Sequence, residues 1–128
     1  MRVFKLPGFS RFQRKEGMTD NALCKAVRDA ERGLIDADLG RGLIKQRVAR
    51  PGQGKRGSYR TIIAYRVKKR AVFLFGFAKS GKSNLDPDEL EALAKRGAVW
   101  LGATVAVIER ALATNELMEV DCSDEDEG

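Results

Sequence analysis

The chain has 128 residues, of which 43% are hydrophobic and 33% are charged, a balance that suits a single domain with a real core. The formal net charge is +6, but five of the eighteen acids lie in the last eight residues, so residues 1–120 carry 24 basic and 13 acidic side chains. A basic body with a short acidic tail is typical of nucleic-acid binding. We expect a domain over residues 1–120 and a disordered acidic tail over residues 121–128, which would act as a solubiliser or mimic the ligand.

The absence of histidine and the presence of only two cysteines limit the metal sites and the acid–base catalysis that the chain can support. The chain contains no histidine, the usual acid–base group at physiological pH and a common metal ligand, so we expect no metal and no cofactor. Cys24 and Cys122 match no metal-binding or redox spacing, and a disulfide framework is not expected, in agreement with a reducing cytoplasm. Pro7 and Gly8 interrupt the early apolar residues, so we expect no secretory signal sequence. No apolar run approaches the roughly 18 residues that a membrane span needs. We therefore expect a cytoplasmic protein without a membrane segment.

The N-terminal third predicts one strand and a helical hairpin. Residues 2–5 form a candidate strand, and residues 9–15 a short helix. Thr19 is a good N-cap for a second helix over residues 20–32, which carries apolar residues at helical spacing and ends before Gly33.

The middle of the chain changes to β-rich segments, at residues 43–50, 58–67 and 71–78. Their short links favour an antiparallel meander, with the third and most apolar strand in the centre. On the first strand, Lys45 and Arg47 fall on one face and Ile44 and Val48 on the other, because strand side chains alternate. Arg60 alternates in the same way with its neighbours on the second strand.

The last third predicts helices again. Asp86 marks the start of a third helix, with Pro87 at its first position and acidic residues in its first turn. Gly97 and Gly102 are candidate breaks in this helix. A further helix is expected over residues 104–113 and a short strand over residues 117–120.

The charge pattern of residues 41–60 is the main functional signal. This stretch holds seven Lys and Arg and no acid, and no Asp or Glu occurs in the 47 positions between Asp38 and Asp86. A solvated surface normally mixes both signs. Any single strand cation can be a solvated outer residue, but that interpretation does not account for the exclusion of every acid. The pattern indicates a surface for a polyanion.

Residues 76–83 match the G-x-x-x-x-G-K-[ST] pattern of a nucleotide-binding loop, which would make Lys82 a triphosphate ligand. In such a loop the helix begins at the Lys-Ser pair, whereas here Asp86 and Pro87 mark the helix start. No apolar strand ending in Asp follows, and an antiparallel meander leaves little room for the parallel sheet of that motif. We therefore reject an NTPase and interpret Lys79 and Lys82 as parts of a basic loop.

Two functions fit the basic surface. A passive RNA or DNA binder needs only the charges, and its affinity falls steeply with salt. A ribonuclease must also help to deprotonate the 2′-hydroxyl, stabilise the phosphorane and protonate the leaving 5′-oxygen. Without His, and with no acid in the basic run, Lys and Tyr would have to carry the protons, and crowded cations can lower a lysine pKa. Tyr59 and Tyr65 are packing residues by default, and Phe73, Phe75 and Phe77 are expected in the core rather than in a base-stacking platform.

Several separated motifs occur together, namely DLGRGLIKQR at 38–47, GQGKRGSYR at 52–60 followed by TII, FLFGFAK at 73–79, Asn84, and a helix that opens DEL at 88–90. Their order resembles the RelE/HigB toxins of bacterial type II toxin–antitoxin systems, from the first strand to about Val120. The resemblance implies an α+β fold, with an N-terminal helical hairpin and C-terminal helices on a small antiparallel β-sheet. It also implies a ribosome-dependent mRNA endonuclease (mRNA interferase) that needs no metal and leaves 2′,3′-cyclic phosphate and 5′-hydroxyl ends. A cognate antitoxin, expected to be of the helix-turn-helix type, would silence it.

The resemblance also assigns site residues. Lys45, Arg47 and Arg60 match positions that hold phosphate or take part in the chemistry, with Arg60 stabilising the transition-state phosphate. The predicted RNA-binding set around them is Arg41, Arg50, Lys55, Arg56, Tyr59, Lys79 and Lys82. Several relatives place a Tyr or His after the last strand, but residues 80–85 contain neither, so either a lysine substitutes or activity is weak. The alternatives are a non-catalytic RNA- or protein-binding member of the same fold and a gyrase-directed toxin.

Overall fold

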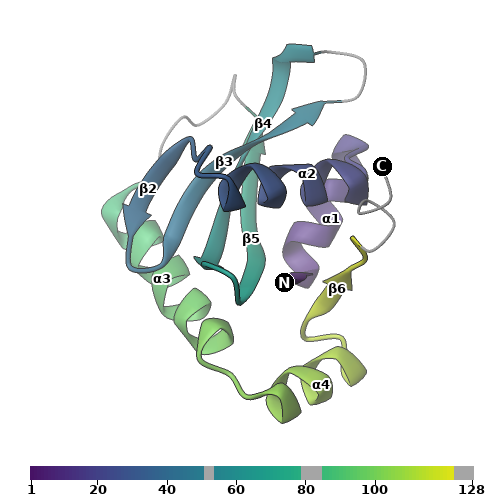
Figure 1. The fold of residues 1–128 in the computed structure, drawn as a ribbon, viewed down its shortest axis with the longest axis vertical. Coiled ribbons are helices and arrows are strands. Elements are labelled where there is room, and N and C mark those ends of the chain that lie inside the picture. The colour runs from purple at the N-terminus through teal and green to yellow at the C-terminus, as the bar shows by residue number, and fades with distance from the viewer. Residues whose placement is uncertain (51–53, 79–84, 123–128) are drawn as a thin grey trace.

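The computed structural model describes residues 1–50, 54–78 and 85–122, with the backbone alone for residues 50 and 54–57. The described residues form six strands and four helices (Figure 1). In chain order these are β1 (Arg2–Lys5), α1 (Pro7–Glu16), α2 (Asp20–Glu31), β2 (Ala37–Gly40), β3 (Leu43–Arg50), β4 (Gly54–Arg66), β5 (Arg70–Ala78), α3 (Pro87–Leu101), α4 (Val105–Ala113) and β6 (Met118–Val120). None of the helices in these ranges is long and apolar enough to cross a bilayer.

The strands form one sheet in the order β2-β3-β4-β5-β1-β6. The predicted antiparallel meander of β3, β4 and β5 is confirmed, and β5 lies inside the sheet. The sheet as a whole is mixed rather than antiparallel, because β1 pairs with β5 in parallel. Strand β2 was not predicted, since it has only four residues and pairs with β3 over a short, irregular register. The α+β class is confirmed.

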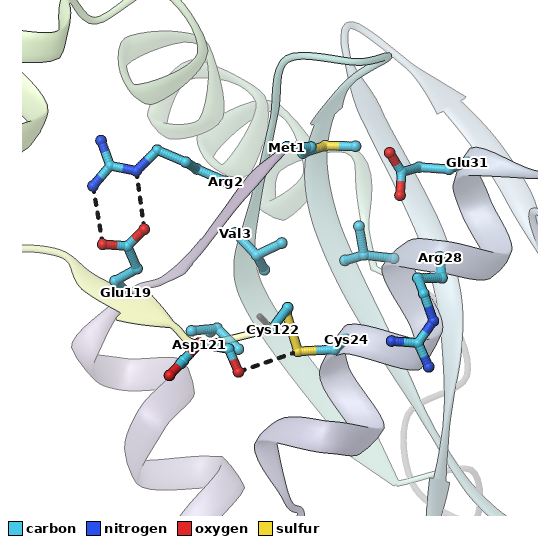
Figure 2. A pocket seen from close by; sticks show the side chains of 11 residues that line it. Met1, Arg2, Val3, Cys24, Arg28, Glu31, Glu119, Asp121 and Cys122 are labelled. Carbon is cyan, nitrogen blue, oxygen red and sulfur yellow. Dashed lines mark hydrogen bonds and ion pairs between the residues drawn. A yellow bond between two sulfur atoms is a disulfide. The ribbon is translucent and has the colours of Figure 1, made fainter. Parts of the chain in front are cut away.

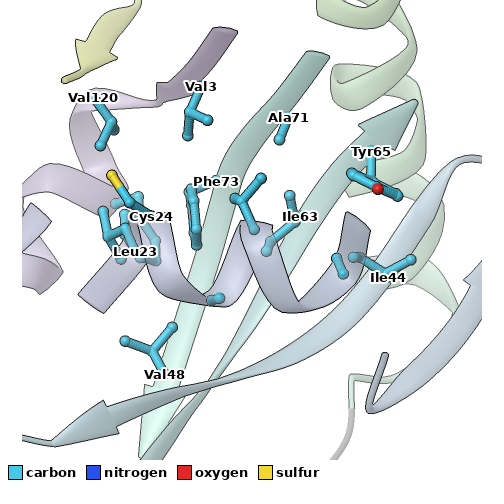
Figure 3. Packing of buried hydrophobic residues seen from close by; sticks show 14 of the residues in the cluster. Val3, Leu23, Cys24, Ile44, Val48, Ile63, Tyr65, Ala71, Phe73 and Val120 are labelled. Carbon is cyan, nitrogen blue, oxygen red and sulfur yellow. The ribbon is translucent and has the colours of Figure 1, made fainter. Parts of the chain in front are cut away.

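Helices cover both faces of the sheet, and each face has its own core. Helices α1 and α2 pack on one face, where α2 lies across the middle strands (Figure 1). The core beneath them includes Leu23, Ile44, Val48, Ile63 and Phe73 (Figure 3). Helix α3 packs on the opposite face, against β4 and β5. The core on that side includes Phe4, Leu43, Ile62, Leu74 and Leu101.

The predicted starts of α2 and α3 are confirmed, whereas α1 begins at Pro7 and not at Phe9. Thr19 accepts a hydrogen bond from the backbone N–H of Ala22 at the start of α2. Asp86 and Glu89 form a reciprocal capping box at the start of α3, with Pro87 in its first turn. These caps set where α2 and α3 begin.

Two glycines are places of close approach between elements. Helix α3 continues through Gly97, so the predicted break there is wrong. A Cβ atom at Gly97 would lie 2.9 Å from the Cβ atom of Ala64, which shows how closely α3 approaches β4. A Cβ atom at Gly76 on β5 would lie 2.5 Å from Cε2 of Phe12 and 3.1 Å from Cε1 of Phe9. Both glycines are therefore required by packing.

The two cysteines correct the sequence prediction. Cys24 of α2 and Cys122, two residues beyond β6, form a disulfide that spans 98 positions of the chain. Cys122 is thus held against α2 rather than belonging to a disordered tail. The sequence contained no spacing signal for this pairing, because the fold alone brings the two residues together.

We predict that breaking the disulfide lowers the free energy of unfolding by about 2–4 kcal/mol, because the crosslink restricts the unfolded chain over a long loop. Urea unfolding with and without dithiothreitol should show the difference. The variant Cys122→Ser should match the reduced wild type and should not respond to the reductant. Two free thiols in the untreated protein would contradict the crosslink.

We predict that Gly97→Val lowers the free energy of unfolding by about 1–3 kcal/mol, because the added side chain overpacks the contact between α3 and β4. Ala98→Val is the matched control, since Ala98 is exposed on the same helix. The control should change the free energy of unfolding by only about 0.5 kcal/mol. Equal denaturation midpoints for the two variants would show that α3 does not pack this closely.

Candidate nucleic-acid interface

Lys45 and Arg47 alternate along β3 with residues that face α2, and Arg47 also borders a hollow beside α2 together with Ala26. Their neighbours Ile44 and Val48 belong to the core beneath α1 and α2. Gln46, between them, is buried at 3% exposure and donates from Nε2 to the carbonyl oxygen of Ala26 in α2. Alternation along the strand therefore places Lys45 and Arg47 on the opposite face, as predicted.

Arg60 faces the same side from the neighbouring strand. In the register of β3 and β4, Arg47 lies directly opposite Arg60, and Lys45 lies opposite Ile62. The next strand, β5, continues both rows, because Arg60 pairs with Phe77 and Ile62 pairs with Phe75. Two adjacent strands, β3 and β4, thus bring the three predicted catalytic cations together on one face. Positions two apart on a strand are about 6–7 Å apart, a spacing that suits neighbouring phosphates.

Asp36 lies between the two arginines and was missed by the sequence analysis. One carboxylate oxygen is 3.7 Å from Nε of Arg47, and the other is 3.3 Å from Nε of Arg60. Like charges that face each other across a sheet repel, and a shared anion offsets this repulsion. Asp36 precedes β2 in the chain, outside the acid-free run. The basic surface thus contains an acid, although the run between Asp38 and Asp86 contains none.

Gln46 positions Asp36 as well as β3. The Oε1 atom of Gln46 accepts a hydrogen bond of 3.0 Å from the backbone N–H of Asp36, and its Nε2 atom donates to the carbonyl oxygen of Leu34 at 2.9 Å. One buried amide thus ties the segment that carries Asp36 to the strand that carries Arg47. A buried amide with satisfied donors and acceptors fixes local geometry.

Arg60 is far more buried than Arg47. Its side chain is 13% exposed, against 53% for Arg47. Besides the contact with Asp36, its Nη1 atom donates to Oγ of Ser58 at 3.0 Å. Ser58 is a second site residue that sequence reasoning missed. Fixed orientation is what a group needs if it is to stabilise charge that develops on a phosphate.

The remaining predicted residues do not all lie here. Arg41 is at the far end of β3, in the turn after β2, where its Nη1 atom is 3.9 Å from Oε1 of Glu91 in α3. It is thus not brought beside Arg60. The other predicted basic residues lie in part or entirely outside the described structure, with only the backbone described for Arg50, Lys55 and Arg56 and nothing for Lys79 and Lys82.

Tyr59 corrects the predicted RNA-binding set. Its ring is 1% exposed in the core beneath α1, where it packs edge-on against Phe12. Its hydroxyl donates to Oε1 of Glu16 at 2.9 Å. A ring that is 1% exposed cannot stack on or contact an RNA base. Tyr59 is a packing residue, which was its default interpretation.

Tyr65 is also removed from the candidate proton carriers. It is 9% exposed and belongs to the same core as Tyr59. Burial and the nearby Glu31 carboxylate raise the pKa of its phenol above the usual value, which makes proton release harder. The tyrosines are thus removed from the expected proton carriers, which leaves the lysines of that expectation and adds the carboxylate of Asp36.

A pocket of about 630 Å³ lies elsewhere, between α2, β1 and β6 (Figure 2). Its wall contains the disulfide, and the guanidinium of Arg2 binds the carboxylate of Glu119 there with two bonds of 2.9 Å. None of the predicted site residues lines it. The basic surface on β3 and β4 is thus a sheet face and not part of this pocket.

We predict that Asp36→Asn lowers the free energy of unfolding by about 1 kcal/mol, because Arg47 and Arg60 then face each other without their shared anion. The loss should be larger at low salt than at high salt, since ions screen the repulsion. Urea unfolding at two ionic strengths measures it.

The matched control is Asp38→Asn on β2. The carboxylate of Asp38 accepts a hydrogen bond from the backbone N–H of Gly40, and an amide oxygen can accept the same bond. This variant should show a smaller change with little dependence on salt. An equal, salt-independent effect of both substitutions would contradict the role given to Asp36.

Comparison with protein-family models matches residues 1–120 to the RelE toxin of the RelE/RelB toxin–antitoxin system. A comparison with curated proteins gave no match. The matched range contains every strand and helix described above, including the strands that carry Lys45, Arg47 and Arg60. The chain therefore belongs to the RelE toxin family and is the toxin of a toxin–antitoxin system, with an antitoxin as its partner.

Proposed function

We propose that the protein is an endoribonuclease that cleaves mRNA on the ribosome and so inhibits translation. The observation that carries the proposal is the group of three cations, Lys45, Arg47 and Arg60, on one face of two adjacent strands. Membership of the RelE toxin family supports it. The resemblance to HigB toxins noted in the sequence points the same way.

The proposed reaction is an internal transesterification of RNA. The 2′-oxygen attacks the adjacent phosphorus, the bond to the 5′-oxygen breaks, and the products carry a 2′,3′-cyclic phosphate and a 5′-hydroxyl. In this reaction Arg60 stabilises the negative charge on the phosphorane, since its guanidinium is fixed by Asp36 and Ser58. Lys45 acts as the base that takes the proton of the 2′-hydroxyl or as an additional charge stabiliser, whereas Arg47 acts only as a charge stabiliser, because a guanidinium keeps its proton in proteins. No metal ion takes part in the proposed steps.

The proposal extends to the surroundings of these cations. The basic side chains that follow in the chain, Lys55, Arg56, Lys79 and Lys82, would position the RNA backbone by charge. The protein would act in the cytoplasm, because ribosomes and its cognate antitoxin are there; the Cys24–Cys122 disulfide, which is unusual in a reducing compartment, does not contribute to this proposal. A helix-turn-helix protein is the expected antitoxin.

We predict that Arg60→Ala lowers mRNA cleavage about 100-fold or more, because one oriented group that stabilises transition-state charge is lost. Primer extension on an mRNA translated in a purified system measures this as the loss of new 5′ ends. Arg11→Ala is the control, since Arg11 is an exposed cation on α1, which covers the other face of the sheet. It should cut like the wild type.

The same assay separates the alternatives. If Arg60→Ala cuts as well as the wild type, the assignment of Arg60 is wrong. A wild type that arrests translation without new 5′ ends is a non-catalytic binder. Double-strand breaks in DNA, with mRNA intact, would instead indicate a gyrase-directed toxin.

A further inference from the structure

We propose that Phe75 is a stacking platform for a nucleobase of single-stranded RNA, next to the cations that hold the RNA backbone. The inference rests on the proposed function, because it names how the same surface would hold its RNA. It assigns a role to a side chain that the sequence analysis placed in the core.

Phe75 is the most exposed aromatic side chain of the protein. All nine aromatic residues lie within the described ranges, and Phe75 is 37% exposed whereas the others are buried or half-buried. Its neighbours on β5 show the contrast, since Phe73 is fully buried and Phe77 is 8% exposed. Burial of apolar rings is favourable, so an aromatic ring left open beside a basic site suggests a ligand.

A β-bulge turns Phe75 towards the cations. The register of β4 and β5 shifts at this point, because Ile62 pairs with Phe75 while Ile63 pairs with Phe73. Leu74 and Phe75 therefore follow each other on the face that carries Ile62, although strict alternation would send Phe75 towards α1. Bulges occur next to active sites, where they redirect a side chain.

The position of Phe75 relative to the cations suits a nucleotide. One row across the sheet contains Lys45, Ile62 and Phe75, and the next contains Arg47, Arg60 and Phe77. Phe75 is thus the diagonal neighbour of Arg60, at about 7–8 Å. Its ring also contacts that of Phe77, with centroids 6.0 Å apart and planes tilted by 38°, which supports it from one side.

This arrangement of a flat ring beside backbone-binding cations is the general means of holding single-stranded nucleic acid. Cations bind the phosphates, and bases stack on aromatic side chains with little regard to sequence. Stacking contributes a part of the binding affinity that depends little on salt. The phosphate contacts contribute a part of the affinity that falls as the salt concentration rises. These two parts can be measured separately.

The test is the binding of a fluorescently labelled single-stranded oligoribonucleotide, measured by anisotropy over a series of salt concentrations. Phe75→Leu should weaken binding about 10-fold at every salt concentration, with an unchanged salt slope. Arg47→Ala should instead reduce the salt slope by about one. Phe75→Trp should keep the affinity, and its fluorescence should be quenched on binding beyond any change of Trp100 in the wild type.

An oligonucleotide series with one abasic position locates the stacked base. At that position, loss of the base should weaken binding to the wild type and have little effect on Phe75→Leu. Val105→Ala is the control, because Val105 is an apolar residue on α4 with 63% exposure. It should bind like the wild type, and thermal unfolding checks that each variant is folded.

The outcomes distinguish this inference from the proposed function. If the wild type binds RNA and Phe75→Leu binds equally well, the stacking role is overturned and the cationic site stands. A change of salt slope in Phe75→Leu would also overturn it, because the substitution would then act through the phosphate contacts. If the wild type binds no RNA and cuts no mRNA, both proposals fail.

Discussion

Repulsion between Arg47 and Arg60, which face each other across β3 and β4, is the constraint on which the site depends. Two guanidinium groups in this position would separate unless an anion lay between them, and Asp36 supplies that anion. The protein therefore presents a concentrated positive charge without a large loss of stability. An incoming phosphate meets cations that are already oriented, although it must compete with the Asp36 carboxylate for them.

The regular parts of the structure determine how rigid this site is. Arg47 and Arg60 lie on strands whose other faces are packed under α1 and α2, so the backbone beneath them has little freedom. Gln46 extends this rigidity to the segment that carries Asp36, because it bonds that segment and α2 at once. A site built on strands holds its groups more accurately than one built on loops. The amphipathic pattern of β3 thus serves both packing and function.

Sequence reasoning succeeded where a periodic pattern decided the outcome. Alternation along β3 and β4 was enough to place Lys45, Arg47 and Arg60 on one face, and the cap residues Thr19 and Asp86 were enough to place the starts of α2 and α3. It failed where distant segments meet. Asp36 lies beside the arginines because β2, the unpredicted strand that follows it, pairs with β3. Cys24 meets Cys122 only because β6 lies at the sheet edge near α2. Phe75 was misplaced for a local reason, since one extra residue in β5 interrupts the alternation.

Gly76 shows how the extra residue in β5 is kept in place. Its Cα hydrogens lie against the rings of Phe9 and Phe12, where no Cβ atom fits. A slip of β5 by one residue would carry Phe75 or Phe77 into that contact, and neither ring could be accommodated. The alternative pairing of β5 is therefore excluded by volume rather than by a weaker set of hydrogen bonds. A single absent side chain in this way selects one of two possible strand registers.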